Sequence, residues 1–133
     1  MDTNTNDKVI EKELSYKIVG ILFEAHTQLG GKFPEKVYQK AVEKLLIRER
    51  LNYKKELPVN LTFEGDKIGQ YFLDFLIEEK VVLELKAVTR FRPEDFKQVL
   101  YYLKATNLEL GILANFKSSK LSYKRILNRN SNS

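Results

Sequence analysis

The chain has 133 residues, 43% of them hydrophobic, which suits one globular domain and is too short for two. It contains no cysteine, and this excludes disulfides, thiolate zinc sites, iron–sulfur clusters and thiol nucleophiles. The formal net charge of +5 arises in residues 117–133, which hold five basic residues and no acidic one, whereas residues 1–116 hold 18 of each sign.

The N-terminal residues lack the apolar core of a signal peptide, and no apolar run reaches membrane-spanning length. We therefore expect no membrane association and a cytoplasmic location. Residues 1–8 and 128–133 have the polar composition of disordered ends, which leaves 9–127 as the single domain.

Two helices are expected first. The spacing of apolar residues predicts a helix over 9–29, which ends at Gly30-Gly31. The apolar residues at helical spacing are Leu14, Ile18, Ile21, Leu22, Ala25 and Leu29. A second helix opens near Pro34 and runs to about residue 50, with Glu35 beside the positive end of its dipole.

Three strands should follow. After "LNYKKELP" the apolar period becomes two, and "EGDKIG" reads as a hairpin connection to a second strand over 68–77. That strand and a third over 81–87 look too uniformly apolar to have a wet face, so both are expected to be central.

A third helix begins at Pro93 and ends near residue 105, and it precedes a fourth strand, "ELGILANF", and an edge strand, "KLSYKRIL". The expected order is ααβββαββ. The sequence thus predicts an α/β fold with a central mixed β-sheet flanked by helices, in which antiparallel hairpins lead into a helical crossover.

Three charged residues interrupt the second and third strands: Asp74, Glu84 and Lys86. Residues two apart on a strand share a face, so Glu84 and Lys86 point the same way. The short turn makes the two strands antiparallel neighbours, and one register brings Asp74 to the same face. Buried charges are costly unless they are paired or bound to metal.

Two converging carboxylates suit Mg²⁺ or Mn²⁺, which take protein carboxylates, waters and phosphate oxygens. A bound cation would activate water, and Lys86 would orient that water or stabilise charge on a phosphate. This is phosphodiester hydrolysis chemistry. The alternative is a plain salt bridge between Glu84 and Lys86, with Asp74 capping a loop.

The pattern of Asp74, then Glu84-Leu85-Lys86, on hairpin-joined strands before a helix resembles the PD-(D/E)xK nuclease superfamily. Gln98 and Tyr102, four apart on the next helix, are similar to the Q-x-x-x-Y signature of its exonuclease-like branch. The stretches "HTQLGGKFPEKVYQKAV", "DFLIEEKVVLELKAV" and "QVLYYLKATNLELGILANF" resemble the GxxExxY family within that superfamily. The resemblance implies a restriction-endonuclease-like core.

It also implies a role for each matching residue. Asp74 and Glu84 would bind the metal with the Leu85 carbonyl, Glu35 would reach toward it, and Lys86 would assist the attacking water. Gln98 and Tyr102 would support the metal site or contact the nucleic-acid backbone. Lys32 stands where the family name has a glycine, so the loop that aims Glu35 departs from the pattern.

The leading hypothesis is therefore an Mg²⁺- or Mn²⁺-dependent nuclease acting on DNA, or on RNA. A second is a non-catalytic module of the same fold that binds nucleic acid or protein, which the charge balance of residues 1–116 favours. A third is a homo-oligomer, such as a homodimer, formed through the edge strand at 121–126. His26 is expected to satisfy a local hydrogen bond rather than to bind metal.

Overall fold

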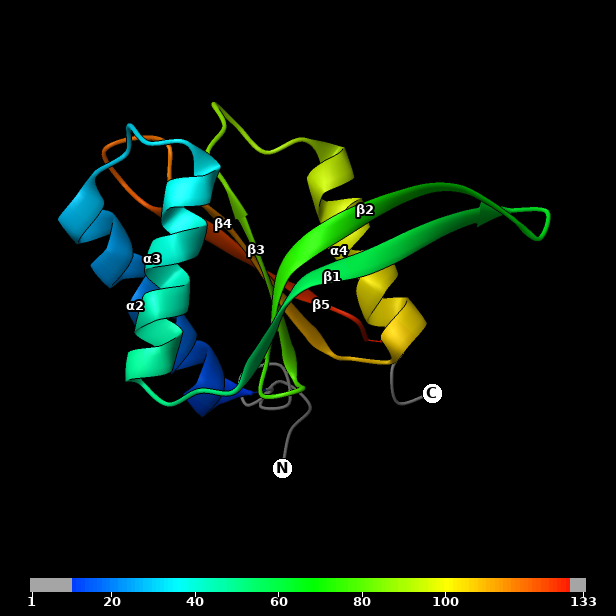
Figure 1. The fold of residues 1–133 in the computed structure, drawn as a ribbon, viewed down its shortest axis with the longest axis horizontal. Helices are drawn as coiled ribbons and strands as arrows, with labels where there is room; N and C mark the ends of the chain where they lie inside the picture. Colours follow the sequence, from blue (N-terminus) through cyan, green and yellow to red (C-terminus); the bar gives the residue numbers. More distant parts are fainter. Residues whose placement is uncertain (1–10, 130–133) are drawn as a thin grey trace.

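The computed structural model describes residues 11–129, so the expectations for residues 1–8 and 130–133 lie outside the described residues. The predicted element order is confirmed in this range (Figure 1). The elements are α2 (Lys12–Leu29), α3 (Glu35–Arg48), β1 (Tyr53–Phe63), β2 (Asp66–Ile77), β3 (Val81–Lys86), α4 (Pro93–Thr106), β4 (Leu110–Asn115) and β5 (Ser122–Leu127).

The sheet is mixed, as predicted, and its five strands lie in the order β1-β2-β3-β4-β5. Three neighbouring pairs are antiparallel, and β3 and β4 are parallel because α4 carries the chain back across the sheet between them. This order places β3 at the centre, with β1 and β5 at the edges.

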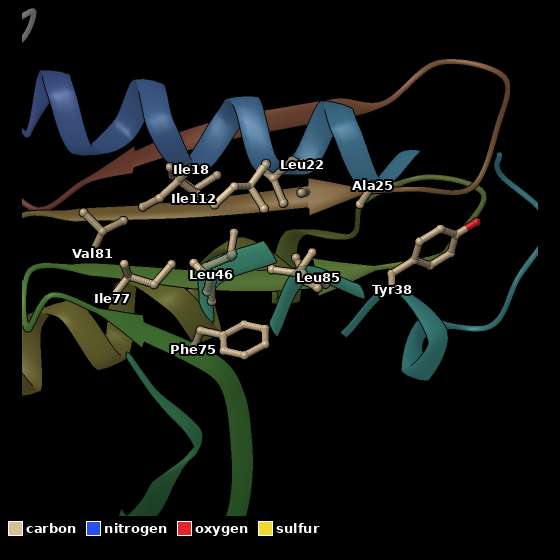
Figure 2. Close-up of a cluster of buried hydrophobic side chains, with 14 of the residues drawn as sticks. Ile18, Leu22, Ala25, Tyr38, Leu46, Phe75, Ile77, Val81, Leu85 and Ile112 are labelled. Carbon is tan, nitrogen blue, oxygen red and sulfur yellow. The ribbon is translucent and has the colours of Figure 1, made fainter. Parts of the chain in front are cut away.

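Helices cover both faces of the sheet. The larger buried cluster lies between the sheet and the pair α2 and α3, where Figure 2 shows Ile18 and Leu22 opposite Ile112, with Leu46 and Leu85 close by. A smaller cluster joins Val82 and other residues of the sheet to α4. The two clusters fix β3 from both sides, since alternate residues of a strand enter opposite layers.

The expectation that the second strand is buried throughout is wrong for half of its length. Residues 73–77 are mostly buried, but residues 66–72 are exposed or half-buried. The outer part of β2 pairs only with β1, and this hairpin projects beyond the rest of the molecule (Figure 1). We call residues 58–72 the arm. An apolar run is buried only where other strands and helices reach it.

Strand β1 also begins earlier than predicted, at Tyr53, so most of "LNYKKELP" is strand rather than connection. Tyr53 pairs with Ile77 and packs its ring edge-on against Phe75. Pro58 is tolerated within the strand because β1 lies at the edge of the sheet, where one side of the backbone needs no partner.

The loop between α2 and α3 is fixed against the loop between β4 and β5. A side chain at Gly31 would clash with the backbone of Ser118, and the carbonyl of Ser118 lies 2.8 Å from His26 Nε2. The predicted hydrogen bond of His26 therefore exists, but its partner is distant in sequence rather than local. Tyr38 is buried beside this corner and stacks on Phe116, which fixes the start of α3.

Among the described helices, none is both long and apolar enough to cross a membrane.

Candidate active site

Strands β2 and β3 separate at the predicted carboxylates. The last paired residues are Phe75 and Leu83, so Asp74 and Glu84 face each other one residue beyond the ladder. Side chains replace the missing ladder bonds there: the Asp74 N–H donates to Glu84 Oε1 (3.0 Å), and the Leu85 N–H donates to Asp74 Oδ2 (2.7 Å). The register that the sequence left open is the one that brings the two carboxylates together.

The direction of Asp74 depends on a break in the alternation of β2. Leu73 and Leu76 both enter the cluster under α4, although residues three apart on a regular strand face opposite ways. Glu56 lies across from Asp74 on β1, between the paired residues, and has φ +57°, a left-handed conformation that is uncommon for a residue with a side chain. This irregularity turns Asp74 toward β3, and no sequence pattern signalled it.

Burial raises the pKa of both carboxyl groups. Glu84 is only 5% exposed, and burial together with the neighbouring Asp74 raises its pKa to about 9. Burial also raises the pKa of Asp74, against the opposing effect of the Leu85 N–H bond. Two carboxylates this close in a low dielectric repel each other, so the pair retains a proton unless a cation compensates its charge.

Lys86 is the nearest cation to this pair, and Asp95 helps to hold it. Lys86 Nζ lies 3.6 Å from Glu84 Oε2 and 3.6 Å from Asp95 Oδ1. Asp95 is 2% exposed and also caps α4, because its carboxylate accepts the Arg92 N–H (2.8 Å). Sequence reasoning used Asp95 only as a helix-start signal. Its position three residues after Arg92 at that start was the available clue to its buried carboxylate.

Helix α3 brings two more side chains to the pair. Gln39 donates a hydrogen bond to Asp74 Oδ1 (2.6 Å), and sequence reasoning missed this residue. Glu35, in the first turn, lies near the Ala87 backbone; burial raises its pKa, Lys86 opposes this and Asp74 adds to it. A pocket of about 420 Å³ opens here, lined by Glu35, Gln39, Glu56, Phe72, Leu73, Asp74 and Glu84.

Of the predicted residues, Leu85, Lys86, Gln98 and Tyr102 do not line this pocket, and the last two also lie apart from the carboxylates. The ring of Tyr102 packs in the cluster under α4, and burial raises its pKa, with Lys54 opposing the shift. Lys54 pairs with Glu79 in the turn at the far end of β2 and β3. Gln98 is half-buried, and its backbone carbonyl accepts a hydrogen bond from Tyr71 (2.8 Å). Helix α4 therefore reaches the site through Asp95.

The donor set fits a hard divalent cation with few protein ligands. Asp74, Glu84, Glu35 and Asp95 bring four carboxyl groups to the region around the half-buried Lys86. No three acidic, histidine or cysteine side chains within that range are close enough to hold an ion by themselves. Mg²⁺ typically takes one or two carboxylates and completes its shell with water and substrate oxygens.

Comparisons with known proteins agree with the fold. A family model described as the PD-(D/E)XK nuclease superfamily matches residues 12–126. Among solved structures, SSO0001 has a TM-score of 0.55 at 20% identity, covering 70% of this chain and 49% of its own. An alkaline exonuclease (LHK-Exo) from Laribacter hongkongensis has a TM-score of 0.50 at 14% identity, covering 72% of this chain and 57% of its own.

The chain thus spans about half the length of these two structures, and at these identities the likeness concerns the fold alone. A search of the curated proteins finds no match.

Proposed function

Since the chain belongs to the PD-(D/E)XK nuclease superfamily, we propose that it hydrolyses phosphodiester bonds of DNA, or of RNA, with Mg²⁺ or Mn²⁺ as cofactor. The observation that carries this proposal is that the half-buried Asp74 lies beside the buried Glu84, with Lys86 Nζ 3.6 Å from Glu84 Oε2. Two carboxyl groups held together where two strands separate are unfavourable in a purely structural role, because they repel each other when both are ionised in a low dielectric. A divalent cation would remove that cost.

Asp74 and Glu84 are the proposed metal ligands, with the Leu85 carbonyl as a backbone ligand. A cation held there would polarise the phosphate and lower the pKa of a nearby water. Lys86 is placed to orient the attacking water and to stabilise negative charge as the new phosphorus–oxygen bond forms and the bond to the leaving oxygen breaks. Gln39 restricts the rotation of Asp74 by its hydrogen bond, and Asp95 does the same for Lys86.

Glu35 is proposed to reach the metal, directly or through a water, from the first turn of α3. Its elevated pKa, caused mainly by burial, would fall once a cation is present. This role is the one that the resemblance to the GxxExxY family, within the superfamily, implies. It is compatible with Lys32, because Gly31 already makes the close approach to Ser118 that positions the start of α3.

Gln98 and Tyr102 are proposed to act as support only. Tyr102 packs beneath the sheet, so its substitution should affect stability more than the chemical step.

The test is cleavage of labelled DNA and RNA, single-stranded and duplex, with Mg²⁺, Mn²⁺ or EDTA. We expect metal-dependent cleavage, and a loss of about 10²-fold or more in Glu84→Gln and Lys86→Ala with unchanged circular dichroism. Glu79→Gln is a matched control, because this glutamate is exposed in the β2–β3 turn and should leave activity intact. Full activity in both site variants would disprove the proposal.

The second candidate, a non-catalytic module, is favoured by the even charge balance of residues 1–116. Titration with Mn²⁺ separates the two. A catalytic site should bind the ion and lose it in Asp74→Ala, whereas a module that binds nucleic acid without binding Mn²⁺ supports the second candidate.

A further inference from the structure

An exposed aromatic ring stands at the mouth of the candidate active site. Phe72 lies two residues before Asp74, lines the same pocket, and is 55% exposed. It belongs to neither hydrophobic cluster, and within residues 11–129 its ring contacts no other aromatic ring. Its neighbour Leu73 is fully buried, so the strand presents the phenyl ring to solvent beside the carboxylates.

Lysines line a second pocket that adjoins the first. This pocket, of about 270 Å³, lies between α3 and the base of β1 and β2, and it shares Gln39, Glu56 and Asp74 with the pocket at the carboxylates. Lys36 and Lys40 line it one helical turn apart, and neither forms an ion pair with another described residue. Together the two pockets form one groove that leads past Asp74, with the unpaired Lys36 and Lys40 at one end and the ring of Phe72 at the other; Glu43 and Lys55, which also line it, pair with each other.

We propose that this groove binds single-stranded nucleic acid, with a base stacked on Phe72 and the adjacent backbone phosphates at Lys36 and Lys40. The inference names the substrate class of the proposed nuclease function and so rests on it. In a duplex both faces of a base are covered by its stacked neighbours, so only an unpaired base can lay its face on the ring.

The balance of charges supports the same substrate. A site that binds duplex through its phosphates uses many basic contacts, whereas residues 1–116 have no net charge and the groove offers two unpaired lysines. Stacking adds affinity that does not depend on charge. It is also tolerant of sequence, because every base has a flat face. We therefore expect weak sequence preference and a shallow salt dependence.

The experiment measures binding rather than cleavage, in a Glu84→Gln background that removes the capacity to cut. Fluorescence anisotropy compares a labelled 15-nucleotide single strand with its duplex. We expect the single strand to bind more tightly than the duplex. Phe72→Ala should weaken the affinity for the single strand roughly 5- to 150-fold, and Phe72→Tyr should restore that affinity. Phe63→Ala, an equally exposed ring at the far end of the arm, should change it less than about twofold.

The lysines are tested by the salt dependence of the same binding. Substituting Lys36 and Lys40 with glutamine should reduce the slope of log affinity against log salt by about 0.7 for each lysine. Lys44→Gln is the matched control, because Lys44 is exposed on the same helix outside both pockets and should leave the slope unchanged.

Tighter binding of duplex, or a Phe72→Ala variant with unchanged affinity, overturns the inference, and so does an equal loss in Phe63→Ala. These outcomes are independent of catalysis. If the wild-type protein cleaves nothing but the variants behave as expected, the nuclease proposal fails and the groove stands. If it cleaves but Phe72 does not affect binding, the groove fails and the nuclease proposal stands.

Discussion

The inner and outer halves of β2 differ in what surrounds them more than in composition. Residues 73–77 lie between β1 and β3 with helices on both faces, and they are mostly buried. Residues 66–72 have β1 as their one neighbouring strand, and Ile68 and Phe72 are more than half exposed there. The carboxylate pair sits at the boundary, where β2 parts from β3. The same strand thus stabilises the fold at one end and offers a surface to a ligand at the other.

The sharpest test of this comparison uses two adjacent residues on opposite sides of the boundary. Leu73 has no exposed surface, so Leu73→Ala should lower the free energy of unfolding by about 2–5 kcal/mol through lost burial and a residual cavity. Phe72→Ala should change it by less than about 1 kcal/mol, although it removes a larger side chain. Urea denaturation measures both. Equal losses would mean that the arm is part of the core.

A second test concerns the polar support of the inner half. Asp95→Asn keeps the shape of the side chain but removes the charge beside Lys86, and we expect metal-dependent cleavage to fall about 10- to 100-fold. Binding of a single strand should not change, because Asp95 lines neither pocket of the groove. Glu94→Gln, on the exposed side of the same helical turn, is the control. A loss of binding in Asp95→Asn would place this residue in the ligand surface instead.

The third test follows the free energy of unfolding against pH in EDTA. The folded state raises the pKa of Glu84 to about 9, so between its unfolded value near 4.5 and 9 the folded protein binds more protons than the unfolded one. The contribution of Glu84 to the free energy of unfolding is therefore complete below pH 4.5 and is lost as the pH rises toward 9. The loss is at most about 1.4 kcal/mol per pH unit. Asp74 and Glu35 shift in the same direction.

Glu84→Gln should flatten this decline, and chemical denaturation at a series of pH values would show it. Wild-type stability that rises with pH over this range would contradict the assigned burial of the pair.

Sequence reasoning reached the fold because hydrophobic period, helix starts and turn residues all indicate the same architecture. It singled out Asp74, Glu84 and Lys86, which the structure brings together, for a related reason, since charges inside apolar strands are conspicuous. It failed for the outer half of β2, where an apolar composition is equally compatible with a core and with an exposed arm.

The roles of three other residues could not be predicted from the sequence, for physical reasons. Gln39 meets Asp74 only through tertiary packing, across 35 positions of sequence. Asp95 serves two purposes, and its helix-capping pattern concealed its contact with Lys86. Glu56 acts through a backbone angle that its residue type does not favour, so no propensity could have indicated it.

The turn at the end of the arm has a practical consequence. Gly65 has open space around it and a positive φ, and the flanking Phe63 and Asp66 already pair across the turn. Exposed turns of this kind accept inserted sequence with little effect on folding. A short tag or a fluorophore placed between Glu64 and Gly65 would leave the body of the domain intact, and it would label the protein at a point away from the proposed groove.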